Sequence, residues 1–201
     1  NVLQAGNGQN VARQIALNSG LPVDVPAMTI NEVCGSGMKA VILARQLIQL
    51  GEAELVIAGG TESMSQAPML KPYQSETNEY GEPISSMVND GLTDAFSNAH
   101  MGLTAENVAT QFSVSREEQD RYALSSQLKA AHAVEAGVFS EEIIPVKISD
   151  EDVLSEDEAV RGNSTLEKLG TLRTVFSEEG TVTAGNASPI NDGSCVLLMM
   201  S

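Results

Sequence analysis

The sequence is poor in basic residues. Its 201 residues include 11 Lys and Arg against 27 Asp and Glu, which gives a formal net charge of −16 at pH 7. Sequence-independent binding to nucleic acid and docking on anionic membranes both depend on Lys and Arg side chains. We therefore expect neither a nucleic acid nor a membrane surface among the partners of this chain.

Long apolar runs and cysteines are also scarce. No uninterrupted apolar stretch approaches the roughly 18 residues that a transmembrane helix needs. The two cysteines, Cys34 and Cys195, are too few for a disulfide framework, and their separation is not that of metal ligands. No leader of basic and then apolar residues follows Asn1. We expect a reduced, cytoplasmic protein without a metal site.

Aromatic residues make up only 3% of the chain, but 42% of the residues are hydrophobic, which is enough for a packed core. The two ends of the chain read as parts of larger elements. Residues 1–6 resemble the exit from an earlier element, and residues 195–200 resemble a buried strand that stops one residue before the end. We interpret the chain as a fragment.

The first third of the sequence predicts alternating strands and helices. Apolar spacing and a following glycine favour a short helix over residues 9–19, and β-branched residues favour a strand over 27–33. Residues 38–50 are apolar on several sides, which predicts a buried helix, and 54–58 form a short apolar strand. Strand, helix and strand with short links predict a βαβ unit and a parallel sheet.

The composition changes near residue 65. Residues 65–100 are rich in Pro, Gly and Asn and predict a long loop region. Helices are expected over 103–112 and 115–136, and the second opens with a capping box. Residues 141–160 carry eight acidic side chains and predict a solvated segment, and a final strand is expected over 195–200.

Cys34 is the first candidate for chemistry. It lies between a predicted strand and a predicted helix, and Gly35 and Gly37 allow a tight turn beside it. The N–H groups at the start of a helix favour the thiolate form of a cysteine and can bind an oxyanion. Strand, sharp turn, nucleophile and helix are typical of a nucleophile elbow. The alternative is that Cys34 is a small buried hydrophobic residue, as many free cysteines are.

The other chemically active residues give weaker signals. Cys195 lies among Val and Leu in an apolar strand, so we expect it in the core. His132 is expected on the surface or in packing, and His100 could face a ligand at the end of the long loop. Neither histidine is a convincing catalytic base, although a thiol nucleophile needs one.

Several longer motifs follow one another along the whole chain. They are QAGNGQN at 4–10, NEVCGSGM at 31–38, AGGTESMS at 58–65, DGLTDAF at 90–96, HMGLTAEN at 100–107, GTVTAGNAS at 180–188 and NDG at 191–193. In this order they resemble the thiolase family, of the acetyl-CoA acetyltransferase (acetoacetyl-CoA thiolase) type. The resemblance covers about the middle half of a family member.

The resemblance implies an α/β fold with a thiolase-like core and an inserted, mostly helical loop domain. Residues 1–65 would be part of the N-terminal βαβ core domain and carry the nucleophile. Residues 66–187 would form the loop domain that covers coenzyme A, and residues 188–201 would be the return strand of the core. The C-terminal catalytic domain would be absent from this chain.

The resemblance also implies an activity. Thiolases condense two acetyl-CoA molecules to acetoacetyl-CoA, or catalyse the reverse thiolysis, through an acetyl-cysteine, and Cys34 matches that cysteine. The positions that match contacts to coenzyme A or its pantetheine arm are Leu92, His100, Met101, Phe176, Ala184 and Ser188. Coenzyme A is the carrier of the substrate, and no further cofactor is implied. Short-chain biosynthetic use, as in the mevalonate pathway, and a homodimer or dimer of dimers are also implied.

The family's activating His, second Cys and water-positioning Asn belong to C-terminal motifs that this sequence does not contain. We therefore expect the chain alone to be inactive. Two other interpretations stay open. The chain could belong to another thiolase-like condensing enzyme of the ketoacyl synthase type, or it could be a non-catalytic fragment that binds coenzyme A or serves assembly.

Overall fold

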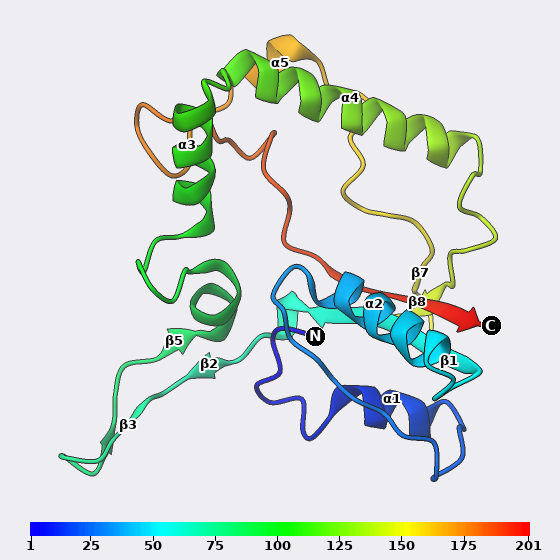
Figure 1. Cartoon of the computed structure of the whole chain (residues 1–201). Helices are drawn as coiled ribbons and strands as arrows, with labels where there is room; N and C mark the ends of the chain where they lie inside the picture. Colours follow the sequence, from blue (N-terminus) through cyan, green and yellow to red (C-terminus); the bar gives the residue numbers. More distant parts are fainter. The chain divides into compact units, whose positions relative to one another are not determined.

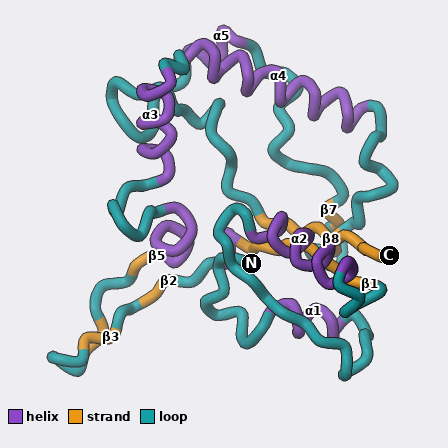
Figure 2. Tube along the Cα trace, viewed as in Figure 1, coloured by secondary structure: helices purple, strands orange, loops and turns teal.

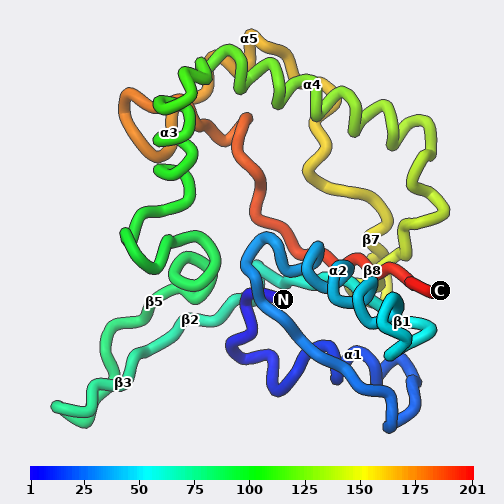
Figure 3. The backbone as a smooth tube through the Cα atoms, viewed as in Figure 1, coloured from blue at the N-terminus to red at the C-terminus, as the bar shows by residue number.

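The computed structural model describes all 201 residues, and they form two compact units. The first unit contains Asn1–His100 and Ile190–Ser201, and the second contains Met101–Pro189. The continuous trace in Figure 3 can be followed from one unit into the other and back again. The chain therefore leaves the first unit once and returns to it for its last strand.

The first unit is organised around one long antiparallel strand pair. Strand β1 (Leu55–Ser63) pairs with β8 (Asp192–Met200), so that Leu55 lies opposite Met200 and Ser63 opposite Asp192. Helix α2 (Ser36–Gln49) lies along this pair, as Figure 1 shows, and most of its contacts are to β1. The pair unites segments that are far apart in the sequence.

The two helices of the first unit occur where local signals predict them. Helix α1 (Val11–Asn18) begins after Asn10, whose side chain accepts a hydrogen bond from the Arg13 N–H. Helix α2 ends at Gln49, two residues before Gly51, which has a φ of +73°. Both helix expectations are therefore confirmed to within two residues at each end.

The strand expected over residues 27–33 does not form, and the expected βαβ unit and parallel sheet are wrong for this chain. A strand needs a neighbouring strand for its backbone groups, and these residues bond to other partners. The Ala27 carbonyl accepts from the Asn10 side chain, and the Ile30 carbonyl accepts from the amino group of Asn1. The strand pairs that Figure 2 colours orange are all antiparallel.

Helix α2 and strand β8 are more exposed than their composition predicts. Only Ser36 and Ala44 are buried in α2, and no residue of β8 is buried. Strand β8 has one neighbouring strand, and α2 covers one side of the pair, so apolar side chains on the other sides reach solvent. The expectation that Cys195 belongs to the core is therefore wrong, since Cys195 is exposed in β8.

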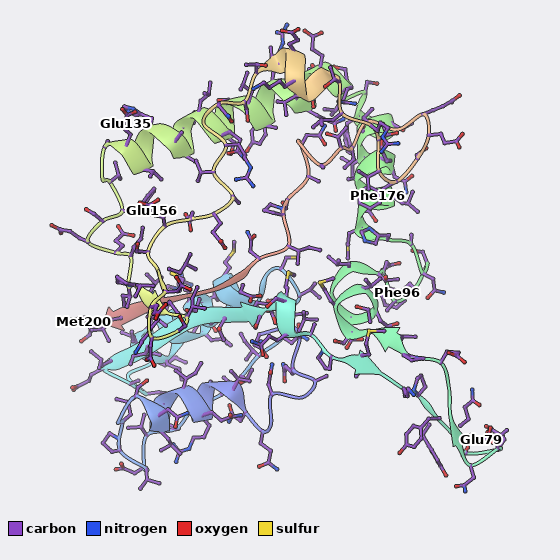
Figure 4. The ribbon with its side chains drawn as sticks, turned by 180° about the vertical axis from the view of Figure 1, so that it is seen from behind. Glu79, Phe96, Glu135, Glu156, Phe176 and Met200 are labelled. Atoms are coloured by element: carbon purple, nitrogen blue, oxygen red, sulfur yellow. The ribbon has the colours of Figure 1, made fainter.

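Residues 64–100 contain only short elements. A single turn of 3₁₀ helix, η1 (Met64–Gln66), precedes two short strand pairs and a π-helical turn, η2 (Met87–Leu92). The pairs join β2 (Met69–Leu70) to β5 (Ile84–Ser85) and β3 (Tyr73–Gln74) to β4 (Glu79–Tyr80). Glu79 stands at the far end of this hairpin in Figure 4. By their contacts these residues group with the first compact unit, and the second compact unit begins at Met101.

The second unit is mostly helical. It contains α3 (Met101–Phe112), α4 (Arg116–Glu135) and the short α5 (Leu166–Gly170), together with one small pair of β6 (Val146–Lys147) and β7 (Val153–Leu154). The helices expected over 103–112 and 115–136 are confirmed. The acidic segment 141–160 is exposed over almost its whole length, as expected. None of the helices in the structure has both the length and the apolar character needed to cross a membrane.

Candidate active site

Cys34 lies in a tight turn immediately before α2. The helix begins at Ser36 with Gly35 as its N-cap, and the Gly35 N–H donates to the Glu32 carbonyl at 3.0 Å. The Cys34 side chain is exposed. The expected turn between residue 33 and the helix is therefore present, and the alternative of a buried hydrophobic cysteine is wrong within this chain. An exposed sulfur at the start of a helix is accessible to a substrate carbonyl.

The residue before Cys34 has an unusual backbone conformation. Val33 has a φ of +50°, which is rare for a β-branched residue. Its N–H donates to the Asn31 side-chain oxygen at 2.9 Å, and its carbonyl accepts from the Ser36 hydroxyl at 2.6 Å. Backbone strain of this kind is concentrated at functional sites.

The start of α2, just after Cys34, lies beside Gly60 of β1, and the neighbouring Gly59 faces β8. A Cβ atom added at Gly60 would lie 3.9 Å from the Gly37 Cα, so the start of α2 lies against the backbone of β1. A Cβ atom at Gly59 would collide with the Cys195 carbonyl and would lie 2.9 Å from Val196 Cγ1. Gly60 therefore contacts helix α2, whereas Gly59 contacts strand β8.

Two acidic residues of the sequence motifs tie this unit together. The Glu62 carboxylate accepts hydrogen bonds from the Asn1 side chain and from the Val2 and Leu3 N–H groups at 2.8–2.9 Å. The Asp192 carboxylate accepts from the N–H and the hydroxyl of Ser65. The hydrogen bonds from Ser65 lower the pKa of Asp192 below its ordinary value. Both carboxylates act as hydrogen-bond acceptors that hold neighbouring segments of the chain in place.

Leu92 and His100, two of the expected coenzyme A contacts, lie in one turn of the first unit. Thr93 and His100 form an isolated antiparallel bridge, and the Asp94 N–H donates to the Ala99 carbonyl at 2.9 Å. Both Leu92 and His100 are half-buried. The turn between them exposes Phe96 almost completely, and Figure 4 labels this side chain.

The remaining expected contacts belong to the second unit. Met101 begins α3, and the next residue, Gly102, lies directly against the Phe176 ring, where a Cβ atom would collide with the ring. The structure therefore packs the Phe176 ring against Gly102, the residue that follows Met101 in α3. Ala184 and Ser188 are exposed in the segment that follows Thr183, which is fully buried.

Glu106 joins two motifs within the second unit. Its carboxylate accepts from the N–H and hydroxyl of Thr181 and from the Val182 N–H, all at 2.8–2.9 Å. Burial by itself would raise the pKa of Glu106, but the hydrogen bonds from Val182 and Thr181 outweigh it and lower the pKa. A Cβ atom at Gly180 would collide with this carboxylate, so glycine is needed there.

A buried polar cluster fixes the segment that carries Ala184. Asp120 is 3% exposed and accepts from Arg116 Nε at 2.7 Å and from the Asn186 amide at 3.0 Å. Arg116 also donates to the Leu169 carbonyl at 2.6 Å, and Asn186 accepts from the Thr183 N–H at 2.7 Å. The cluster links α4, the end of α5 and the loop after residue 180.

The comparisons with known proteins agree with this arrangement. The family model for the thiolase N-terminal domain matches residues 1–201. The chain belongs to the thiolase family. The sequence-based expectation of a thiolase is confirmed, and so is the coarser expectation of an α/β thiolase-like fold, because the chain matches a solved thiolase structure over its whole length.

Two relatives and one solved structure illustrate the match. The chain is 53% identical over 207 residues to a protein of Staphylococcus aureus (strain COL) named "Probable acetyl-CoA acyltransferase", covering 100% of this chain and 53% of that protein. A protein of the same name from Staphylococcus epidermidis (strain ATCC 35984) is 51% identical and is covered to 52%. The Acat5 thiolase from Ascaris suum, solved in complex with coenzyme A, superposes with a TM-score of 0.90 at 40% identity and is covered to 52%. The thiolase chain thus spans about half the length of these relatives.

Sequence reasoning did not single out the residues that fix the thiolase turns. Ser36, Glu62 and Glu106 occur inside the motifs, but nothing in their spacing indicates which backbone groups they bind. The positive φ of Val33 has no sequence signal, because β-branched residues avoid that conformation. His132 is exposed near the end of α4, which agrees with a surface position. No group of three His, Cys, Asp or Glu residues could hold a metal ion.

Proposed function

We propose that the protein carrying this chain is a thiolase that forms an acetyl-cysteine on Cys34. The observation that carries the proposal is the exposed Cys34 in a strained turn at the start of α2, within a chain of the thiolase family. The protein would condense two acetyl-CoA molecules to acetoacetyl-CoA or catalyse the reverse thiolysis. The names of the staphylococcal relatives support an acetyl-CoA acyltransferase.

In the first half-reaction, the Cys34 thiolate would attack the carbonyl carbon of acetyl-CoA. A C–S bond to Cys34 forms as the C–S bond to coenzyme A breaks, and the proton of the Cys34 thiol ends on the departing coenzyme A thiol. The N–H of Cys34 would donate to the oxyanion of the tetrahedral intermediate. In the second half-reaction, a base outside these residues would remove an α-proton from another acetyl-CoA, and the resulting carbanion would attack the carbonyl carbon of the acetyl-cysteine. The C–S bond to Cys34 breaks as the C–C bond forms, and the proton returns to the Cys34 thiolate.

We assign Leu92, His100, Met101, Phe176, Ala184 and Ser188 to coenzyme A and its pantetheine arm. The complex of the Ascaris suum thiolase with coenzyme A supports this ligand class. We assign residues 66–187 to the loop domain that covers coenzyme A, and most of that segment is the second compact unit.

The wider setting follows from the family. We propose that the intact protein is cytoplasmic, forms a homodimer or a dimer of dimers, and works in short-chain biosynthesis, as in the mevalonate pathway. The acid–base groups of the second half-reaction would come from the part of the protein outside these 201 residues. The isolated chain should therefore produce no acetoacetyl-CoA.

Mass spectrometry of the intact protein after incubation with acetyl-CoA tests the proposal. A mass increase of about 42 Da, one acetyl group, should map to the peptide that contains Cys34. The increase should vanish in Cys34→Ala and persist in Cys195→Ala, which removes the only other cysteine of the chain. Absence of the adduct on Cys34 in the intact, folded protein would disprove the nucleophile assignment.

A further inference from the structure

Val33 is held in a conformation that it would not adopt by itself. Its φ of +50° is disfavoured for any residue with a Cβ atom and most strongly for a β-branched one. The side chain is 43% exposed, so core packing does not force this conformation. Hydrogen bonds from neighbouring groups must therefore offset its cost.

The Ser36 hydroxyl supplies two of these hydrogen bonds. It donates to the Val33 carbonyl at 2.6 Å and accepts from the Glu32 N–H at 2.8 Å. Ser36 is 6% exposed, so water competes little for its hydroxyl. On the other side of Val33, the Asn31 side-chain oxygen accepts from the Val33 N–H at 2.9 Å.

The bonds of Ser36 do not serve as a helix cap. The N-cap of α2 is Gly35, and it has no side-chain capping bond. The Ser36 hydroxyl instead reaches back from the first turn of the helix to residues 32 and 33. Its contacts enclose the turn that contains Cys34 and leave the first N–H groups of α2 without a side-chain cap.

We propose that Ser36 is a positioning residue for Cys34. By holding Val33 at a positive φ, its hydroxyl fixes the direction in which the chain enters Cys34 and so sets the orientation of the exposed sulfur. The inference rests on the proposed function, in which Cys34 is the acyl acceptor. Asn31 assists from the solvent side.

The test compares Ser36→Ala, Val33→Gly and the double variant in the intact protein. Because a small misalignment of a nucleophile is costly, Ser36→Ala should lower the rate constant of Cys34 acetylation about 10- to 100-fold. The KM for acetyl-CoA should change little, because Ser36 is buried and its hydroxyl is engaged by Val33 and Glu32. Glycine adopts a positive φ without strain, so Val33→Gly should restore most of the lost rate in the Ser36→Ala background.

The rescue separates positioning from a purely structural role. If Ser36 only stabilised the fold, Val33→Gly would remove a side chain and would not restore the rate. Failure of rescue, or an unchanged acetylation rate in Ser36→Ala, overturns the proposal. Should Ser36→Ala not fold, Asn31→Ala provides the same comparison from an exposed position, with a smaller loss and the same expected rescue.

Alkylation of Cys34 by iodoacetamide keeps the two proposals apart. This reagent reports on the direction and access of the sulfur without coenzyme A or a catalytic base. If wild type forms no acetyl-cysteine, the proposed function fails. The role of Ser36 would still be supported if Ser36→Ala changed the alkylation rate of Cys34 and the added Val33→Gly substitution restored the wild-type rate. If acetylation occurs and Ser36→Ala alters neither reaction, only the positioning proposal fails.

Discussion

At the scale of single residues, the acidic side chains of the thiolase motifs serve as acceptors for backbone N–H groups. Glu62 binds the first residues of the chain, Glu106 binds residues 181 and 182, and Asp192 binds Ser65. An ionised carboxylate forms stronger hydrogen bonds than a neutral group. In a chain with a net charge of −16, these residues stabilise turns that neutral side chains would hold less firmly.

The pH dependence of stability provides a test of Glu106. Its pKa is lower in the folded chain than its ordinary value of 4.5, so its contribution is complete above that value and is lost as the pH falls through the folded pKa. Glu106→Gln should destabilise the second unit by about 1–2 kcal/mol at pH 7. The difference from wild type should shrink as the pH falls from 4.5 through the lower pKa of the folded chain, because the carboxyl becomes neutral first in the unfolded and then in the folded protein.

Thermal unfolding of both proteins between pH 3 and pH 8 measures this effect, with Glu135→Gln as control. Glu135 ends α4 and is exposed, and Figure 4 labels it on that helix. The control should follow wild type to within about 0.5 kcal/mol at every pH, as exposed positions usually do. A gap between Glu106→Gln and wild type that stays constant down to pH 3 would contradict the role of the ionised carboxylate.

At the scale of elements, local signals predicted the helices and the strands at 54–58 and 195–200, which correspond to β1 and β8, but not the absence of a strand over 27–33. The helix over 115–136 was predicted from its capping box, and Ser115 and Glu118 form that box in the structure. The cap depends on four consecutive residues, so the sequence alone contains it. Whether residues 27–33 form a strand and whether Cys195 is buried depend on which distant segments pack against them. A local sequence pattern carries no information on these neighbours.

The capping box of α4 supports a prediction on helix stability. Ser115 accepts a hydrogen bond from the Glu118 N–H at 3.2 Å, and its own N–H donates to the Glu118 carboxylate at 2.8 Å. Ser115→Ala should destabilise the second unit by about 1 kcal/mol, because the first turn of the helix loses its side-chain acceptor. Chemical denaturation followed by circular dichroism measures the change.

The matched control for this variant is Ser126→Ala, which replaces an exposed serine in the middle of the same helix. Alanine favours a helix interior slightly more than serine does, so this variant should be neutral or stabilising. Equal destabilisation of the two variants would show that the cap contributes nothing beyond the general effect of losing a serine.

At the scale of the whole molecule, the motifs predicted the family, and contacts between distant segments define the units. The composition of the sequence changes just after the motif at 58–65, and this change predicts a domain boundary at residue 65. In the structure, residues 66–100 group with the first unit, and Pro68 lies beside Gly6 and Gly91 beside Leu3. Such a grouping depends on contacts between segments that are more than sixty residues apart.

Each unit is held together by polar contacts of its own, so we expect the two units to have separate free energies of unfolding. Asp120→Ala would leave the half-buried Arg116 guanidinium without its carboxylate and free the Asn186 amide. Breaking a buried pair in this way should lower the free energy of opening of the second unit by about 3 kcal/mol. In the first unit, Glu62→Ala should loosen the N-terminal residues that its carboxylate holds.

Hydrogen exchange followed by mass spectrometry can measure both effects in one protein. Asp120→Ala should accelerate exchange of amides in α4 and α5 and leave β1 and β8 at wild-type rates, whereas Glu62→Ala should act on the first unit alone. The expectation follows because the contacts of Asp120 and Glu62 stay within their own units. Accelerated exchange in β1 and β8 of Asp120→Ala would instead show that the two units unfold as one. In that case a substitution in the second unit could reach Cys34 through stability alone, so acetylation rates of such variants would need to be compared at equal fractions of folded protein.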